Sequence, residues 1–157
     1  QERKENAGIN GMKVARSIAL LSYRNYQTYT LTQSEDNDEK LDNFKATTYQ
    51  QYEGEKLARR FNAFSYYKLT QSLDTHNIAR GRGSEQEVLG QITAHSLVIG
   101  ISTDILFPVE EQKFIAYHIP RARYIEVDSK YGHDGFLIEI SKLTRILRNN
   151  LKKAEKV

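Results

Sequence analysis

Short apolar segments at regular intervals between residues 95 and 151 restrict the possible folds more than any other feature of the sequence. Residues 96–101 (Ser-Leu-Val-Ile-Gly-Ile) form a short apolar run of the kind found in buried parallel strands. Residues 123–128 alternate apolar with polar side chains, which predicts a second strand.

Two helices are expected to follow these strands. Pro108 with Glu110 and Glu111 after it predicts a helix start, because proline fits the first turn and acidic side chains favour its positive end. Residues 136–151 predict an amphipathic helix with apolar positions at Leu137, Ile140, Leu143, Ile146 and Leu147. The order strand, helix, strand, helix predicts α/β architecture with parallel strands.

The first eighty residues have a helical pattern instead, so the sequence is expected to divide into residues 1–80 and 81–157. A helix is predicted over residues 8–24, where Val14, Ile18 and Leu21 form one apolar stripe. A second, mixed face of this helix holds Met12, Arg16, Ala19, Leu20 and Tyr23. We expect such a helix to pack on one side and to line a cavity on the other.

Further along, residues 32–40 are acidic and polar and predict a loop, and a helix is expected over residues 41–61. Asn62 is a candidate cap for another helix over residues 63–75. Residues 81–84 (Gly-Arg-Gly-Ser) resemble a phosphate-binding loop, but a helical segment precedes them instead of a strand. A capping box of Ser84 with Glu87 is the preferred interpretation.

The composition narrows the classes of function. Apolar residues make up 39% of the 157 residues and charged residues 27%, as expected for one folded domain. The net charge of +3 is spread along the chain, which argues against a nucleic-acid binder. The chain has no cysteine and no apolar run near the roughly 18 residues of a membrane span, and its first residues are not expected to act as a signal peptide. We therefore expect a cytoplasmic protein without membrane or nucleic-acid partners.

Candidate catalytic residues follow the two predicted strands. Asp104 comes shortly after the first strand, and His133 lies in the loop after the second. Because the carboxyl ends of neighbouring parallel strands meet at one edge of a sheet, we expect a contact in which the carboxylate orients the imidazole. Gly132 and Gly135 allow a sharp turn that presents the ring. The alternative is that Asp104 caps a helix and His133 is an ordinary polar loop residue.

Several segments resemble motifs of one enzyme family, the homoserine O-acyltransferases, in the family's order from Gly8 to Leu147. Residues 104–108 (Asp-Ile-Leu-Phe-Pro) with 110–112 are similar to its acid motif, and residues 131–137 (Tyr-Gly-His-Asp-Gly-Phe-Leu) to its histidine motif. The segments that resemble its helical lid are residues 15–16, 22–24, 52–56 and 60–63.

This resemblance implies the C-terminal part of an α/β-hydrolase fold, with residues 81–157, preceded by a helical lid segment, residues 1–80. It implies homoserine O-acetyltransferase activity: transfer of an acetyl group from acetyl-CoA to L-homoserine in methionine biosynthesis by a Ser-His-Asp triad. Acetyl-CoA is then a co-substrate, and no bound cofactor or metal is expected. A cytoplasmic homodimer formed through the lid helices is also implied.

The resemblance assigns roles residue by residue. Asp104 is the triad acid and His133 the general base. Arg16 binds the homoserine carboxylate, Tyr23 lines the pocket beside it, and Asp134 holds the substrate's ammonium group.

Two departures from the family pattern matter. The chain contains no Gly-x-Ser-x-Gly motif, so we expect the nucleophile upstream of these residues and expect the chain alone to be inactive. Asn62 stands where the family often has Asp, and residues 32–40 match the lid poorly. The alternatives are an acyltransferase with a succinyl-CoA donor or a serine acceptor, an esterase of the same fold, or a non-catalytic helical dimerisation module.

Overall fold

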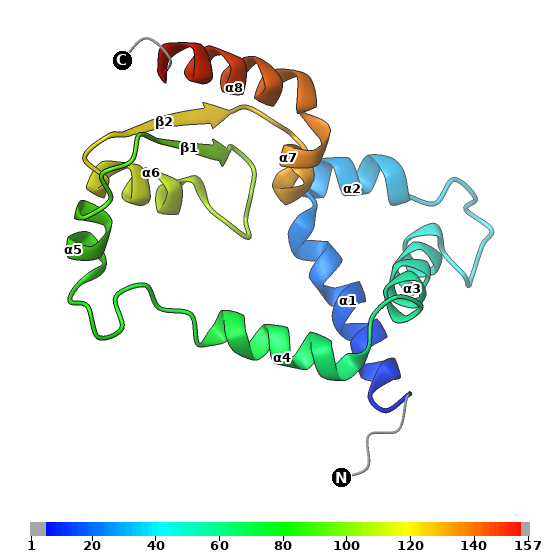
Figure 1. Cartoon of the computed structure of the whole chain (residues 1–157). Coiled ribbons are helices and arrows are strands. Elements are labelled where there is room, and N and C mark those ends of the chain that lie inside the picture. The colour runs from blue at the N-terminus through cyan, green and yellow to red at the C-terminus, as the bar shows by residue number, and fades with distance from the viewer. Residues whose placement is uncertain (1–5, 155–157) are drawn as a thin grey trace. The chain divides into compact units, whose positions relative to one another are not determined.

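The computed structural model describes residues 6–154, and side-chain burial is described as far as Leu151. The chain divides into two compact units, and Figure 1 labels the helices and strands that they contain. The first unit contains residues 26–76 and those up to Leu21, and the second contains residues 77–157 and the short segment Ser22–Asn25. The expected roles of residues 1–80 as a lid and 81–157 as a core stay predictions.

A pair of parallel strands forms the centre of the second unit. β1 (Ser96–Ile101) pairs with β2 (Ala122–Val127) in a register that sets Ser96 opposite Ala122 and Ile101 opposite Val127. Both strands were predicted. The prediction for the second strand, residues 123–128, lies one residue later than β2 in the structure. The buried apolar residues of this unit include Leu89, Ile101, Ile119 and Val127.

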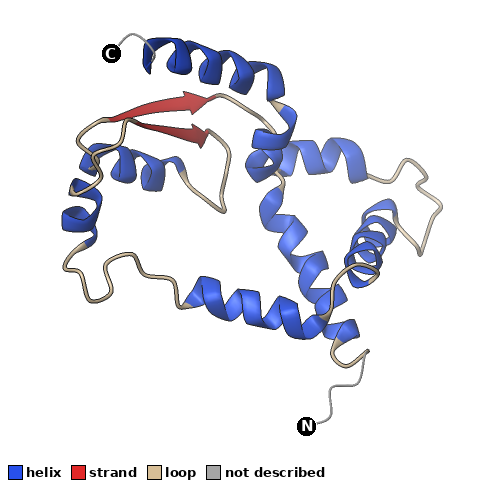
Figure 2. Ribbon diagram, in the orientation of Figure 1, coloured by secondary structure: helices blue, strands red, loops and turns tan. Residues whose placement is uncertain are grey.

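Helices flank the strand pair on both sides, as Figure 2 shows. α5 (Glu85–Gly90) precedes β1, and α6 (Val109–His118) connects the two strands. After β2 come a 3₁₀ turn, η1 (Gly132–Asp134), then α7 (Gly135–Ile138) and α8 (Ile140–Ala154). α8 is held beside β2 by Arg123, whose guanidinium donates to Oδ1 of Asn150 over 3.1 Å.

The last predicted helix, residues 136–151, is divided in the structure. Glu139 separates α7 from α8 because its backbone, with φ −79° and ψ 38°, leaves the helical region. Lys142 donates to the backbone oxygen of Asp128 over 2.6 Å and pairs with Glu139 over 3.1 Å. These contacts fix the start of α8 against the loop after β2.

The first unit contains α1 (Ile9–Tyr23), whose last two residues belong to the second unit, α2 (Tyr26–Gln33), α3 (Lys45–Ala58) and α4 (Ala63–Asp74). α1 was predicted, but its faces were assigned wrongly. Met12 and Leu20, expected on the mixed face, are buried. The apolar stripe of Val14, Ile18 and Leu21, expected to pack, is 59%, 63% and 56% exposed.

Gly54 explains how α1 and α3 approach each other. A Cβ at Gly54 would lie 2.8 Å from the backbone oxygen of Lys13, closer than real Cβ contacts. Ser17 donates to the backbone oxygen of Gln50 over 2.9 Å in the same region. The glycine therefore permits direct backbone packing, which offsets its cost of about 1 kcal/mol in a helix.

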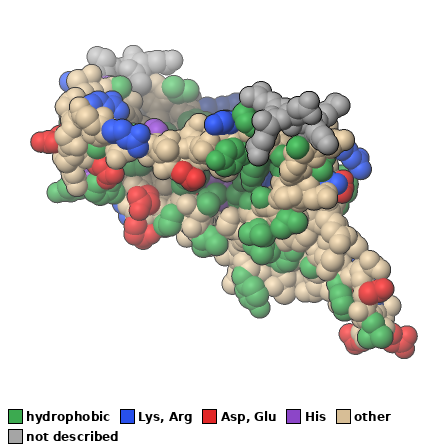
Figure 3. All heavy atoms as spheres, turned by 90° about the horizontal axis from the view of Figure 1, so that it is seen from below, with side chains coloured by type: hydrophobic (Ala, Val, Ile, Leu, Met, Phe, Trp, Pro, Cys, Tyr) green, Lys and Arg blue, Asp and Glu red, His purple; other side chains and the backbone are tan. Residues whose placement is uncertain are grey.

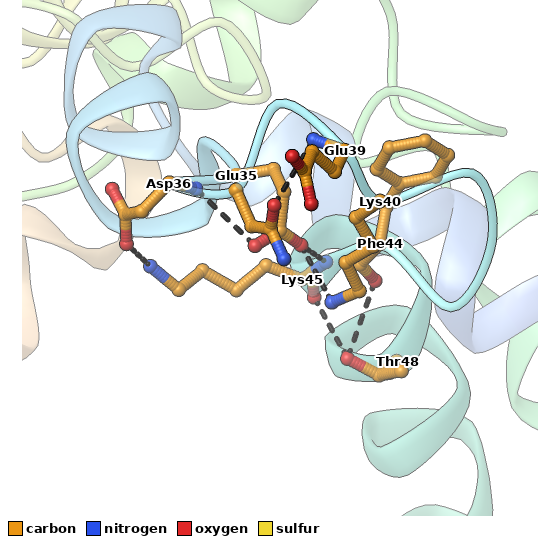
Figure 4. Close-up of polar contacts among 8 residues, drawn as sticks. Glu35, Asp36, Glu39, Lys40, Phe44, Lys45 and Thr48 are labelled. Atoms are coloured by element: carbon orange, nitrogen blue, oxygen red, sulfur yellow. Dashed lines mark hydrogen bonds and ion pairs between the residues drawn. The ribbon is translucent and has the colours of Figure 1, made fainter.

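An ionic network holds the loop between α2 and α3 (Figure 4). Glu35 accepts from Lys40 Nζ over 2.7 Å and from the backbone N–H of Lys45 over 3.1 Å, while Lys45 Nζ donates to Asp36 over 2.6 Å. The hydrogen bond from Lys40 is the main cause that lowers the pKa of Glu35 to about 2. Glu35 thereby accepts the first N–H of α3, and this helix starts later than the predicted residue 41 because the backbone of Phe44, with φ −54° and ψ 150°, is not helical. α2 was not predicted.

Both predicted helix caps are present. The side chain of Asn62 accepts from the backbone N–H of Ser65 over 2.8 Å at the start of α4. Ser84 and Glu87 form the capping box of α5. The interpretation of residues 81–84 as part of a cap is therefore confirmed.

Large apolar side chains are exposed at many of the described positions, and Figure 3 shows such side chains over one face of the molecule. In the second unit they include Ile105, Phe107, Leu137, Ile140 and Leu151, at 55% to 67% exposure. No helix among residues 6–154 is long and apolar enough to cross a membrane.

Candidate active site

The acidic residue of the site is held by the loop that follows β1. Asp104 is buried, and its Oδ1 accepts hydrogen bonds from the backbone N–H groups of Leu106 over 2.8 Å and Phe107 over 2.9 Å. These bonds fix the carboxylate and satisfy one of its oxygens. The second oxygen, Oδ2, is turned toward the loop that follows β2.

His133 lies in that second loop and meets the carboxylate. Its Nδ1 is 2.8 Å from Oδ2 of Asp104, so the predicted contact between the two side chains is present. The register of the strands explains it, because Ile101 and Val127 end β1 and β2 opposite each other. A carboxylate that accepts from Nδ1–H leaves Nε2 as the nitrogen that can take a proton. This arrangement suits a general base.

Aromatic rings surround the imidazole. The ring centroids of Phe107 and Phe136 lie 5.2 Å from that of His133, and the centroid of Tyr23 lies 5.5 Å away. The side chain of His133 is 18% exposed. Contacts on several sides limit rotation of the ring, and the ring therefore keeps Nδ1 toward Asp104.

The two glycines beside His133 act in different ways. Gly132 has φ +63°, and a Cβ there would lie 2.8 Å from the backbone nitrogen of Asn25. It provides the turn that the sequence predicted. Gly135 has an ordinary helical backbone, with φ −53°, so it makes no turn. A Cβ at Gly135 would lie 2.8 Å from Cγ2 of Ile101 and 2.9 Å from Oγ of Ser129. Close packing against these two side chains therefore explains why this position is a glycine.

Asp134, the predicted partner of a substrate ammonium group, already has a cationic neighbour. Its Oδ2 lies 3.4 Å from Nε of Arg24, and both side chains are largely buried, at 22% and 29% exposure. Arg24 was missed as a site residue, because a charged residue at the end of a predicted helix is most simply interpreted as solvated. The pairing was visible only once residues 22–25 were placed beside η1.

The predicted site residues fall in both units. Asp104, His133, Asp134 and Tyr23 all belong to the second unit, and Tyr23 contacts the ring of His133. Arg16 lies on α1 in the first unit, where it is half-buried. Among residues 6–154, no three His, Cys, Asp or Glu side chains gather in a way that could hold a metal ion.

Solved structures with the same architecture identify the fold. Homoserine O-acetyltransferase from Bacillus anthracis matches 85% of this chain and 38% of its own with a TM-score of 0.76 at 19% identity. Esterase E22 matches 94% of this chain and 43% of its own, also with a TM-score of 0.76, at 17% identity. MGS-M2, an alpha/beta hydrolase, matches 90% of this chain and 47% of its own with a TM-score of 0.51 at 21% identity. The chain has part of an α/β-hydrolase fold, with an acid and a histidine after adjacent strands.

Sequence comparison identifies relatives that share one name. The homoserine O-acetyltransferase of Cyclobacterium marinum is 48% identical over 143 residues, which are 91% of this chain and 40% of that protein. That of Trichormus variabilis is 40% identical over 146 residues, which are 93% of this chain and 40% of that protein. The chain is thus a relative of the homoserine O-acetyltransferases and spans about 40% of their length. No protein-family profile matches it.

Proposed function

We propose that this chain forms part of a homoserine O-acetyltransferase, which transfers an acetyl group from acetyl-CoA to the hydroxyl of L-homoserine in methionine biosynthesis. The observation that carries the proposal is the 2.8 Å contact between Asp104 and His133 at the ends of two parallel strands. The relatives in sequence, which bear this name, supply the reaction.

In this proposal His133 is the general base of a triad and Asp104 is its acid. A serine outside these residues attacks the thioester carbonyl, and its proton passes to Nε2 of His133. The proton then goes to the departing thiolate of CoA, and an acetyl-serine remains. The homoserine hydroxyl next attacks this ester while His133 takes its proton, which finally returns to the serine oxygen. Asp104 holds the imidazole in one tautomer and stabilises its charged form throughout.

The substrate is a zwitterion, and both of its charges need partners when it is buried. We assign its carboxylate to Arg16, its ammonium group to Asp134, and one wall of its pocket to Tyr23. The position of Asp134 directly after His133, and the contact of Tyr23 with the imidazole, support this assignment. A carboxylate has two oxygens, so Asp134 can accept from a substrate ammonium while it remains paired with Arg24.

An esterase of the same fold is the second candidate, and the likeness to esterase E22 favours it. Transfer from succinyl-CoA, or to serine, changes the donor or acceptor and leaves the Asp–His pair unaltered. We give precedence to acetyl transfer to homoserine because relatives of that name reach 48% identity.

Three further properties belong to the proposal. We propose acetyl-CoA as a co-substrate with no bound cofactor, because a Ser-His-Asp mechanism needs none. We propose a homodimer formed through the lid helices, which the exposed stripe of Val14, Ile18 and Leu21 on α1 supports. We place the protein in the cytoplasm, a reducing compartment that suits a chain without cysteine.

A chimeric enzyme tests the function. The 143 matching residues of the Cyclobacterium marinum relative are replaced by those of this chain, and the purified chimera is given acetyl-CoA and L-homoserine. We expect O-acetylhomoserine, no product from the 157-residue chain alone, and none from a His133→Ala chimera. His95→Ala, which removes an exposed histidine, is the matched control and should retain activity.

Other outcomes decide between the alternatives. A folded chimera that hydrolyses p-nitrophenyl acetate but does not acetylate homoserine favours the esterase. Transfer from succinyl-CoA that is faster than from acetyl-CoA would change the assigned donor. Transfer to serine that is faster than to homoserine would change the assigned acceptor. A His133→Ala chimera with full activity removes the enzymatic role of this chain and leaves the dimerisation module, which sedimentation of the chain would then test.

A further inference from the structure

Two hydroxyl groups connect the loops that follow the two strands. We call residues 102–108, which contain Asp104, the acid loop, and residues 128–134, which contain His133, the histidine loop. The backbone ladder continues as far as Ser102, whose N–H donates to the backbone oxygen of Val127 over 3.0 Å. Beyond that point Thr103 Oγ1 accepts from the backbone N–H of Gly132 over 3.0 Å and donates to the backbone oxygen of Ser129 over 2.7 Å. The hydroxyl is thus used as acceptor and as donor at once.

Ser102 forms the neighbouring connection. Its Oγ accepts from the backbone N–H of Ser129 over 3.0 Å and lies 3.2 Å from Oδ1 of Asp128, to which it donates. Ser129 is buried, and its own Oγ accepts from the backbone N–H of Tyr131 over 3.2 Å. Ser102 and Thr103 therefore hold the histidine loop at Asp128, Ser129 and Gly132.

The place of Thr103 in this network is specific. Thr103 directly precedes Asp104, and its partner Gly132 directly precedes His133. The hydrogen bond between Thr103 and Gly132 therefore lies one residue before the 2.8 Å contact between Asp104 and His133 in both loops. Any shift of one loop relative to the other would change both distances together.

We propose that Thr103 is a positioning residue of the active site: its hydroxyl fixes the histidine loop so that Nδ1 of His133 stays on Oδ2 of Asp104. It acts through Gly132 and Ser129, not on the reacting atoms. The role in catalysis rests on the proposed function, whereas the role in holding the pair does not. Because both partners of the hydroxyl are backbone groups in a part-buried loop, its removal leaves them without the bonds that set the loop.

The first experiment uses the 157-residue chain itself, labelled with ¹⁵N-histidine. The Nδ1 proton of a histidine that donates to a carboxylate gives a downfield proton resonance, assigned by its loss in His133→Ala. We expect Thr103→Val to broaden or remove this resonance and Thr103→Ser, which keeps the hydroxyl, to restore it. Thr70→Val is the matched control, because Thr70 donates to the backbone oxygen of Tyr67 in α4, in the other unit.

The second experiment measures kinetics in the chimeric enzyme. Displacement of a catalytic group by about 1 Å costs up to about 100-fold in rate, so Thr103→Val should lower kcat by about 10- to 100-fold. The KM for homoserine should change less than about threefold, and Thr103→Ser should recover kcat to within about threefold.

The results separate this inference from the function. An inactive wild-type chimera would reject the acetyltransferase while the resonance still tests Thr103. An unchanged resonance together with an unchanged kcat in Thr103→Val would overturn the positioning role. A rise in the KM for homoserine as large as the fall in kcat in this variant would also overturn it. If Thr103→Val does not fold, Thr103→Ala takes its place. If both are unfolded and Thr103→Ser is folded, the hydroxyl serves folding and not the pair, and the proposal fails.

Discussion

Arg24 and Asp134 form an ion pair in the second unit, with 3.4 Å between Nε of the guanidinium and Oδ2 of the carboxylate. The pair lies beside the histidine of the candidate active site, because Asp134 follows His133 and Arg24 follows Tyr23. Its burial, at 29% and 22% exposure, makes the charges less screened than those of a surface pair.

Replacement of Asp134 by Asn should raise the KM for homoserine in the chimeric enzyme. A hydrogen bond to a charged group contributes about 1.5–3 kcal/mol, so we expect an increase of about 10- to 100-fold. Steady-state kinetics with homoserine varied and acetyl-CoA saturating measure it. Arg24→Met should have a smaller effect, because the carboxylate remains. An unchanged KM in Asp134→Asn would remove Asp134 from the substrate site.

Asp104→Asn should lower kcat by about 10⁴-fold in the same chimera, as expected when an amide replaces the acid of a triad and stabilises the wrong tautomer of its histidine. The backbone N–H groups of Leu106 and Phe107 can still donate to the amide oxygen, so the loop should keep its shape. Circular dichroism checks this, and product formation over long incubations gives the residual rate. A loss of less than tenfold would show that the carboxylate is not the triad acid.

Gly132→Ala should destabilise the chain far more than Gly81→Ala. Both glycines have positive φ, +63° and +71°, and the backbone strain of an alanine there costs about 1 kcal/mol. At Gly81 a Cβ would meet nothing within 4 Å, whereas at Gly132 it would lie 2.8 Å from the backbone of Asn25. We expect the free energy of unfolding in urea to fall by about 1 kcal/mol for Gly81→Ala and by about 2–4 kcal/mol for Gly132→Ala. Equal losses would contradict the close packing of residues 22–25 on the histidine loop.

The hydroxyl of Tyr124 should lose its proton only at unusually high pH, and the stability of the chain should therefore depend on pH in the alkaline range. Burial, followed by the hydrogen bond that its hydroxyl donates to Glu126 over 2.9 Å, raises the pKa of Tyr124 from 10.0 to about 12. A group whose pKa rises on folding stabilises the protein fully below its unfolded value. This contribution should therefore be lost as the pH rises from about 10 to about 12.

Absorbance of tyrosinate against pH tests this titration. Tyr124→Phe should remove the step near pH 12, and Glu126→Gln should move it to lower pH without returning it to 10.0, because burial is the larger cause. A Tyr124→Phe chain that keeps the late step would assign it to another tyrosine.

The parts of the structure that depend on local patterns were predictable from the sequence. The first strand follows from an apolar run and the second from alternating apolar and polar residues. The caps at Asn62 and Ser84 follow from short-range hydrogen bonding, and the contact of Asp104 with His133 from the rule that parallel strands end at one edge. The fold assignment and the resemblance to homoserine O-acetyltransferases are both confirmed.

The features that depend on three-dimensional packing were not predictable. Periodicity identifies a helix at α1 but not which of its two apolar faces is buried, and it does not show that ψ of Glu139 ends a helix. Glycine disfavours a helix by local propensity, and the reason for Gly54 in α3 follows only from the backbone of Lys13 that lies against it. The roles of Arg24 and Thr103 depend on contacts with residues far along the chain, which are Asp134 for Arg24 and Gly132 for Thr103.

The segment Ser22–Asn25 has a consequence for how the chain can be cut. It belongs to the second unit although the residues on both sides of it belong to the first, so the chain crosses between the units at 21–22, 25–26 and 76–77. A protease that cleaves once in the linker between α4 and α5 would therefore separate the segment Ser22–Asn25 from the rest of the second unit and leave it joined to the first unit. The N-terminal product would keep Tyr23 and Arg24, whose contacts are with His133 and Asp134 of the C-terminal product. Nicking at this linker should thus be visible on a denaturing gel before it is visible by gel filtration.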